Sequence, residues 1–113
     1  MEEKINSILR SYTNCFKDLD CSPLMPGEFV ISFDMNNNKL FGSLIDMDRK
    51  IYKQRKILKE LSKIYSNNKD NLIKLSNRLR DVREEIFQVL QKDFNVCSKF
   101  IDKETDQIEY VGL

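Results

Sequence analysis

The most regular part of this sequence runs from residue 43 to residue 94 and reads SLIDMDRKIYKQRKILKELSKIYSNNKDNLIKLSNRLRDVREEIFQVLQKDF. Apolar residues recur there every seven positions, and a second row follows three residues behind the first. Twelve of these fourteen positions are apolar, and only Gln54 and Asn68 are polar. Seven heptads in one phase are typical of coiled coils and packed helices. The two rows, here called the seam, are Leu44, Ile51, Leu58, Tyr65, Leu72, Leu79 and Ile86, and then Met47, Gln54, Leu61, Asn68, Leu75, Val82 and Val89.

A polar run, SNNKDN at 66–71, interrupts the middle of the seam. Asn, Asp and Ser form turns more readily than helices, so a turn here gives two helices of similar length, about 43–65 and 71–94. The unbroken heptad phase favours the alternative, one continuous coiled-coil helix about 75 Å long that requires an extended partner such as a second copy. We favour the antiparallel hairpin, because apolar residues also flank the seam, and each helix must then touch at least two neighbours.

The two polar seam residues have alternative interpretations. Gln54 either fixes the register of the seam or lies in a solvated layer. Asn68 is expected to lie in the turn at 66–71 rather than to act as a register-fixing residue.

The segments around the seam complete one mainly α-helical domain over 1–113. Residues 2–19 carry an amphipathic stripe and are expected to form an N-terminal helix. Residues 28–42 include apolar residues at alternate positions, so a small β-hairpin or an extended connector is expected there. Gly42 and Ser43 are expected to precede the first residue of the next helix.

The carboxyl-terminal segment 95–113 reads as an acidic tail. Asn95 is expected to end the preceding helix, because Asn tolerates the left-handed conformation found just past helix ends. Within the tail, 108–111 either add a short strand, dock on another protein, or remain frayed.

The formal net charge of +1 conceals a strong segregation of charge along the chain. The stretch from Arg49 to Arg80 holds 11 basic and 2 acidic residues, whereas the flanks hold 8 basic and 16 acidic residues. Such a stretch attracts an acidic protein, a phosphate backbone or an anionic surface, but it is also typical of an ordinary solvated helix face. The residues that we expect to contact a polyanion, if one binds, are Lys53, Arg55, Lys56, Lys59, Lys63, Lys69 and Lys74.

The composition argues against several kinds of catalytic and metal site. There is no His, and three Cys alone do not supply the four ligands of a Cys/His zinc site. A Cys nucleophile lacks a His base, and three Gly are too few for a phosphate-binding loop. We therefore expect no enzyme activity, no catalytic residues, no cofactor and no metal.

The cysteines and the hydropathy bear on the cellular compartment. An odd number of Cys at irregular spacing indicates reduced thiols, which favours an intracellular protein in the cytoplasm or nucleus. No apolar run approaches the ~18 residues of a membrane span, and no signal peptide is expected.

These observations favour a non-enzymatic protein–protein interaction module, a small adaptor or scaffold subunit of a multi-subunit intracellular complex. Its partners are expected to be other helical subunits or a second copy in a dimer. Binding of nucleic acid or another polyanion through 49–80 is the alternative, which lacks interleaved aromatic residues and any known binding motif. The residues expected to bind a partner helix are the seam residues Ile51, Leu58, Leu61, Leu72, Leu75, Leu79, Val82 and Ile86.

Overall fold

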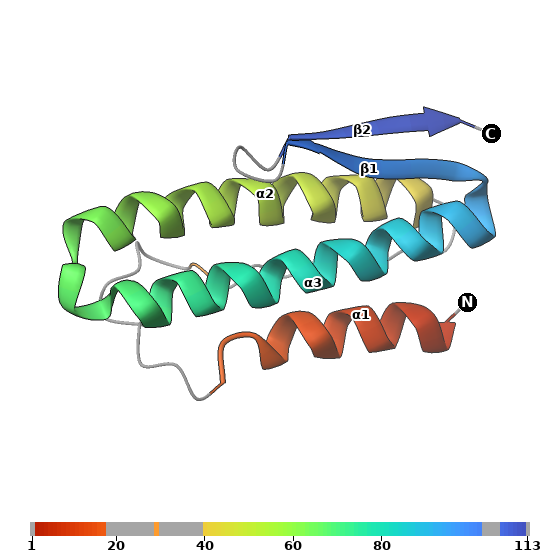
Figure 1. Cartoon of the computed structure of the whole chain (residues 1–113). Helices are drawn as coiled ribbons and strands as arrows, with labels where there is room; N and C mark the ends of the chain where they lie inside the picture. Colours follow the sequence, from red (N-terminus) through yellow and green to blue (C-terminus); the bar gives the residue numbers. More distant parts are fainter. Residues whose placement is uncertain (1, 18–28, 30–39, 103–106, 113) are drawn as a thin grey trace.

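The computed structural model describes residues 2–17, 29, 40–102 and 107–112, and it is mainly helical (Figure 1). This confirms the fold class at the level of a mainly α-helical chain. The elements in chain order are α1 (Glu2–Asn14), α2 (Leu40–Ile64), a 3-10 turn η3 (Ser66–Asn68), α3 (Lys69–Phe94), β1 (Val96–Asp102) and β2 (Gln107–Gly112).

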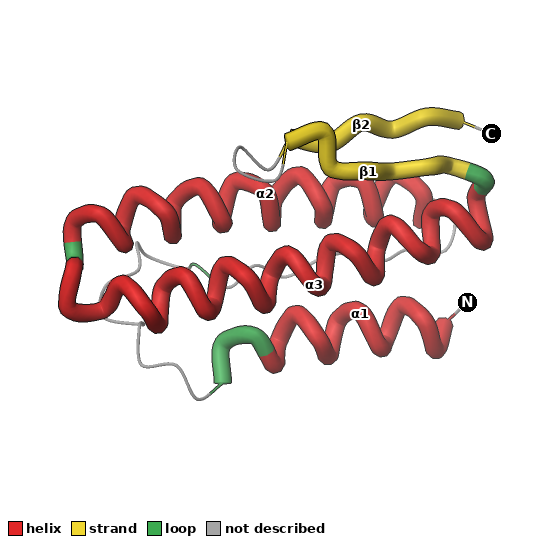
Figure 2. Tube along the Cα trace, in the orientation of Figure 1, coloured by secondary structure: helices red, strands yellow, loops and turns green. Residues whose placement is uncertain are grey.

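Helices α2 and α3 lie side by side and run in opposite directions, joined by Tyr65 and η3 (Figure 2). Two side-chain contacts far apart in sequence, Asp48 with Arg83 and Arg55 with Ser76, link the helices along their length. The polar run at 66–71 thus contains η3 and the start of α3, and Asn68 lies in the turn. The end at which the helices are joined is called the closed end below, and the other is the open end.

Helix α1 packs along α3 in the antiparallel direction (Figure 1). Its apolar residues recur at three- and four-residue steps, so they form one stripe that becomes buried on packing. Ile5, Ile8, Tyr12 and Cys15 are all buried in the same core as the seam residues. The open half of the hairpin is therefore a three-helix arrangement. Helix α1 ends at Asn14 and a turn continues to Lys17; residues 18–19 of the expected helix lie outside the described residues.

The start of α2 corrects one sequence expectation. Leu40 and Phe41, which lie in the segment expected to form a β-hairpin or an extended connector, form the first turn of α2, and Gly42 lies inside the helix rather than before it. The reason is tertiary packing, because Leu40 is buried in the core and the Phe41 ring lies 5.6 Å from that of Phe94. Phe29 has no regular structure, and the rest of the expected hairpin lies outside the described residues.

The carboxyl-terminal segment folds back along the helical pair as an antiparallel β-hairpin (Figure 2). Asn95 ends α3 with φ 55° and ψ 36°, which confirms the expected left-handed cap. Of the alternatives for 108–111, the short strand is the one found, in β2, but its partner β1 was not expected. The register pairs Val96 with Gly112 and Phe100 with Ile108, with an irregularity between Phe100 and Asp102. Val96 packs against the core, which helps to stabilise a two-stranded sheet that is marginal alone.

Candidate functional site

The eight seam residues expected to bind a partner lie inside the folded chain. Seven of them are buried and Leu61 is partly buried against the same core. In this conformation they offer no surface to a partner, because α2 and α3 cover each other's seams. A partner helix would have to displace one of the chain's own helices. The residues concerned are Ile51, Leu58, Leu61, Leu72, Leu75, Leu79, Val82 and Ile86.

The basic stretch is only partly available at the surface. Arg55 is 3% exposed, and its Nε donates a hydrogen bond to Ser76 Oγ at 3.1 Å, which corrects its place among the polyanion-binding residues. Lys59 is half-buried. The other members are exposed, namely Lys53, Lys56, Lys63, Lys69 and Lys74. Lys63 Nζ lies 3.4 Å from Glu60 Oε1 and Lys56 Nζ lies 4.7 Å from the centre of the Tyr52 ring, so two of these ammonium groups also have local contacts.

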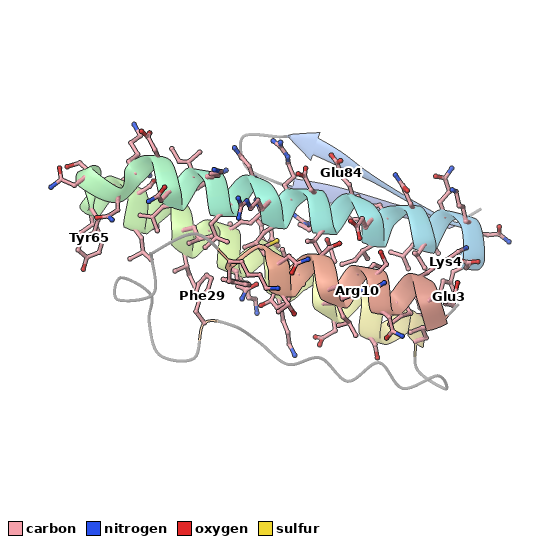
Figure 3. The ribbon with its side chains drawn as sticks, turned by 90° about the horizontal axis from the view of Figure 1, so that it is seen from below. Glu3, Lys4, Arg10, Phe29, Tyr65 and Glu84 are labelled. Carbon is pink, nitrogen blue, oxygen red and sulfur yellow. The ribbon has the colours of Figure 1, made fainter. Side chains whose placement is uncertain are left out.

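A group of large apolar side chains remains exposed around the closed end. We call Ile57, Ile64 and Tyr65 the closed-end patch; their exposed fractions range from 38% to 69%. Ile73 of α3 is also exposed, but it lies on the other flank of the seam. Ile57 and Ile64 are seven residues apart on α2 and therefore lie on the same helix face. Figure 3 shows Tyr65 projecting from this end of the molecule. Ile57 and Ile64 belong to the apolar residues that flank the seam, and the sequence pattern by itself does not mark them as a surface.

The length of α1 explains why this patch is uncovered. Arg78 Nη1 donates hydrogen bonds to the carbonyl oxygens of Cys15 and Lys17, at 3.5 and 3.0 Å. Farther along α3, Ser11 Oγ donates to Glu85 Oε1, and Lys4 Nζ lies 3.1 Å from Asp93 Oδ2. These contacts place α1 beside α3 from Arg78 to the open end. Within the described residues, the first turns of α3 and the last turns of α2 have no third helix beside them.

A buried ion pair crosses the α2–α3 interface. Asp48 and Arg83 have side chains that are each 1% exposed, and Arg83 Nε donates to Asp48 Oδ1 at 2.6 Å. The guanidinium also lies 5.3 Å from the Tyr52 ring and 5.7 Å from the Phe87 ring, as in cation–π contacts. The pair joins the two helices and faces no solvent, so Asp48 does not contribute to the charged surface of the open end.

Gln54 forms another buried polar contact. Its Nε2 donates to Tyr12 Oη at 2.8 Å and to the Phe29 carbonyl oxygen at 2.6 Å. The solvated-layer interpretation is therefore wrong, because Gln54 is buried and connects α2 with α1. Its Oε1 is buried and has no hydrogen-bond partner in the structure. The sequence shows that a polar residue occupies this seam position, but it does not reveal the partners of that residue, because they depend on how α1 packs.

Among the described residues, the thiol of Cys15 is free and buried. Burial raises the pKa of the Cys15 thiol to about 11, and Sγ donates to the Ser11 carbonyl oxygen, so the nucleophilic thiolate is disfavoured at neutral pH. No three or more Cys, Asp or Glu side chains gather as metal ligands in the described parts of the chain. None of the helices described combines the length and apolar character that a membrane crossing needs.

Comparison with known proteins gives no relative from which a function follows. No protein-family model matches the chain, and no curated protein or solved structure is significantly similar to it.

Proposed function

We propose that this chain is a non-enzymatic protein–protein interaction module, an adaptor or scaffold subunit of an intracellular complex, which binds its partner through the closed-end patch. The observation that carries the proposal is the exposure of Ile57, Ile64 and Tyr65 where the helical pair lacks a third helix among the described residues. Exposed apolar groups rimmed by polar residues mark interaction surfaces. The proposed binding surface is therefore the uncovered flank of the seam and not the seam itself.

The occupant that fits best is an acidic amphipathic helix of another protein. Beside the open half of α3, α1 supplies a helix whose apolar stripe faces the core. A partner helix along Ile57 and Ile64 would continue this arrangement towards the closed end. The exposed charged side chains nearby are mostly basic, so acidic residues flanking the partner's apolar stripe would be attracted. The basic side chains are Lys53, Lys56, Lys63, Lys69 and Lys74.

We further propose that the antiparallel hairpin, rather than a continuous coiled-coil helix, is the predominant form in solution. Two buried polar contacts between α2 and α3 support this, Asp48–Arg83 and Arg55–Ser76. The contact of Gln54 with Tyr12 adds α1 to the same core. The polar run at 66–71 favours the break, because Asn, Asp and Ser are weak helix formers.

Quantitative pull-down tests the patch. Tagged wild-type chain and the Ile57→Ser/Ile64→Ser variant would be used as baits in extracts of the source cells, and Asn77→Ser/Gln88→Ser, at two exposed polar positions of α3, is the matched control. We expect a partner that contains an acidic amphipathic helix to be retained by the control and depleted at least tenfold by the patch variant. Calorimetry with the synthetic helix should reproduce the loss.

Two outcomes would overturn this function. One is a partner retained equally by the patch variant, with all baits showing the same circular dichroism and unfolding midpoint. The other is capture of nucleic acid that is lost on Lys53→Gln/Lys74→Gln and weakens steeply between low and moderate salt, as phosphate-backbone binding does. That result would favour the polyanion alternative.

A further inference from the structure

We propose that this chain also forms a domain-swapped dimer, in which α2, η3 and α3 become one continuous helix and two copies pair in antiparallel orientation. The hinge is the segment 65–68. The occupant of the interface is a second copy of the chain, so this inference goes beyond the proposed binding of another protein and does not depend on it.

The backbone at the helix break is close to helical already. Two residues leave the helical region, Tyr65 with φ −106° and ψ 75° and Asn68 with φ −109° and ψ 8°. Ser66–Asn68 form a right-handed 3-10 turn, and Lys69 has φ −52° and ψ −47°. A rotation of ψ at Tyr65 by about 120°, with changes of about 50° in φ and ψ at Asn68, brings both residues to the usual helical values and joins α2 to α3. A hinge of four residues, 65–68, is enough for this exchange.

The heptad phase fits the continuous helix better than it fits a loop. Leu58, Tyr65 and Leu72 are spaced by seven residues, as are Leu61, Asn68 and Leu75. A turn places no requirement on this spacing, whereas a continuous helix keeps its seam on one side only if the phase is maintained. In the hairpin Tyr65 is 41% exposed although it occupies a seam position. In the paired continuous helices it would face the second copy and become buried.

The interior contacts of the hairpin would all be reformed between the two copies. Asp48 and Arg83 are equally distant in sequence from the point midway between Tyr65 and Ser66, and so are Arg55 and Ser76. A two-fold axis at that point places Asp48 of one copy opposite Arg83 of the partner subunit, in the same geometry. Such exchange of identical elements costs no core contact, so the balance between the two forms depends on the hinge and on protein concentration.

The experiment compares oligomeric state across concentration for wild type and hinge variants, by light scattering after size exclusion. In Asn67→Ala/Asn68→Leu, a better helix former and an apolar seam residue replace two Asn. We expect this variant to dimerise at least tenfold more tightly than wild type. In Ser66→Pro, Pro stands at the first position of η3, where it is tolerated after the non-helical Tyr65, but it would break a continuous helix. We expect this variant to be monomeric, and Ser66→Ala serves as its control.

Spin labels distinguish the swapped dimer from two closed hairpins in contact. Lys53→Cys and Asn77→Cys would be prepared with the native cysteines replaced by Ser, labelled separately and mixed. In the swapped dimer these positions of different copies lie on adjacent helices, about 10 Å apart between helix axes. Hairpins that meet at their closed ends keep them roughly 35 Å apart, since each is about twelve residues from that end.

Three outcomes would overturn the swapped dimer. The first is a dimer that persists in a folded Ser66→Pro variant, and the second is a spin-label distance of roughly 35 Å with no population near 10 Å. The third is an Asn67→Ala/Asn68→Leu variant that stays monomeric at millimolar concentration. The proposed function is judged separately, because its test varies Ile57 and Ile64 and leaves the hinge intact.

Discussion

Asp48 of α2 accepts a hydrogen bond of 2.6 Å from the Nε of Arg83 of α3, and both side chains are almost completely removed from solvent. Arg83 Nη2 lies 3.3 Å from the second carboxylate oxygen, so the contact is bidentate. Charges in the interior require close partners, because the cost of leaving water is then offset by their attraction. This pair therefore specifies how the two long helices face each other.

Removal of this carboxylate should destabilise the fold strongly. We expect Asp48→Ala to lower the free energy of unfolding by about 3–5 kcal/mol, because the Arg83 charge stays buried without its carboxylate. Asp48→Leu/Arg83→Met should recover most of the loss. Urea unfolding at neutral pH measures both. Asp46→Ala is the control, since the exposed pair of Asp46 with Lys50 contributes less than about 0.5 kcal/mol. Equal unfolding midpoints for Asp48→Ala and Asp46→Ala would contradict this account.

The contact between Gln54 and Tyr12 should attach α1 to the hairpin. We expect Gln54→Leu to lower the free energy of unfolding by about 1–3 kcal/mol, because the carbonyl of Phe29 loses a donor in the interior. Tyr12→Phe should lower the free energy of unfolding by about 1 kcal/mol. In the double variant the effects should be less than additive, as for groups in direct contact. Amide hydrogen exchange should accelerate in α1 more than in α3; unchanged exchange in α1 would argue against this role.

The thiol of Cys15 should react slowly in the folded chain. With a pKa of about 11, about 0.1% of it is thiolate at pH 8, against about 10% for a thiol with the ordinary pKa of 9.0. In a Cys21→Ser/Cys97→Ser background, we expect alkylation by iodoacetamide to be at least 100-fold slower than in urea-unfolded chain. Equal rates in the folded and unfolded states would be inconsistent with burial.

The same raised pKa affects stability at alkaline pH. Since the pKa of the folded state exceeds that of the unfolded state, the contribution of this thiol is fully present below about pH 9 and is lost as the pH rises towards 11. We expect the unfolding midpoint of the Cys15→Ser variant to fall less over this interval than that of the unsubstituted chain. Parallel pH profiles for the two chains would exclude Cys15 as a cause of the loss.

The left-handed residue at the end of α3 gives a further test. At Asn95, with φ 55°, we expect Asn95→Val to destabilise by about 1–2 kcal/mol, because a β-branched side chain is strained there. Asn95→Gly should be neutral or slightly stabilising, because Gly adopts this conformation freely. Thermal unfolding compares the two variants. A Val variant as stable as the Gly variant would show that this conformation is not required.

The local features of this fold follow from short-range properties that are visible in the sequence. The seven-residue repeat predicts the helices, the polar run at 66–71 identifies where they break, and Asn95 identifies where α3 ends. Each depends on the intrinsic preference of a residue and its near neighbours. The sequence predicts that α2 begins after Gly42, whereas it begins at Leu40, because burial of Leu40 outweighs the weak helix preference of Gly.

The candidate site depends on contacts between distant parts of the chain, so the pattern alone did not locate it. Each helix covers the other's seam, which makes the expected partner surface internal. Arg55 is removed from the basic stretch for the same reason, since Ser76 lies opposite it. The reach of α1 along α3, limited at Arg78, leaves Ile57 and Ile64 exposed. Helical periodicity assigns a residue to a helix face, whereas the order in which helices pack determines whether that face meets the core, a partner or water.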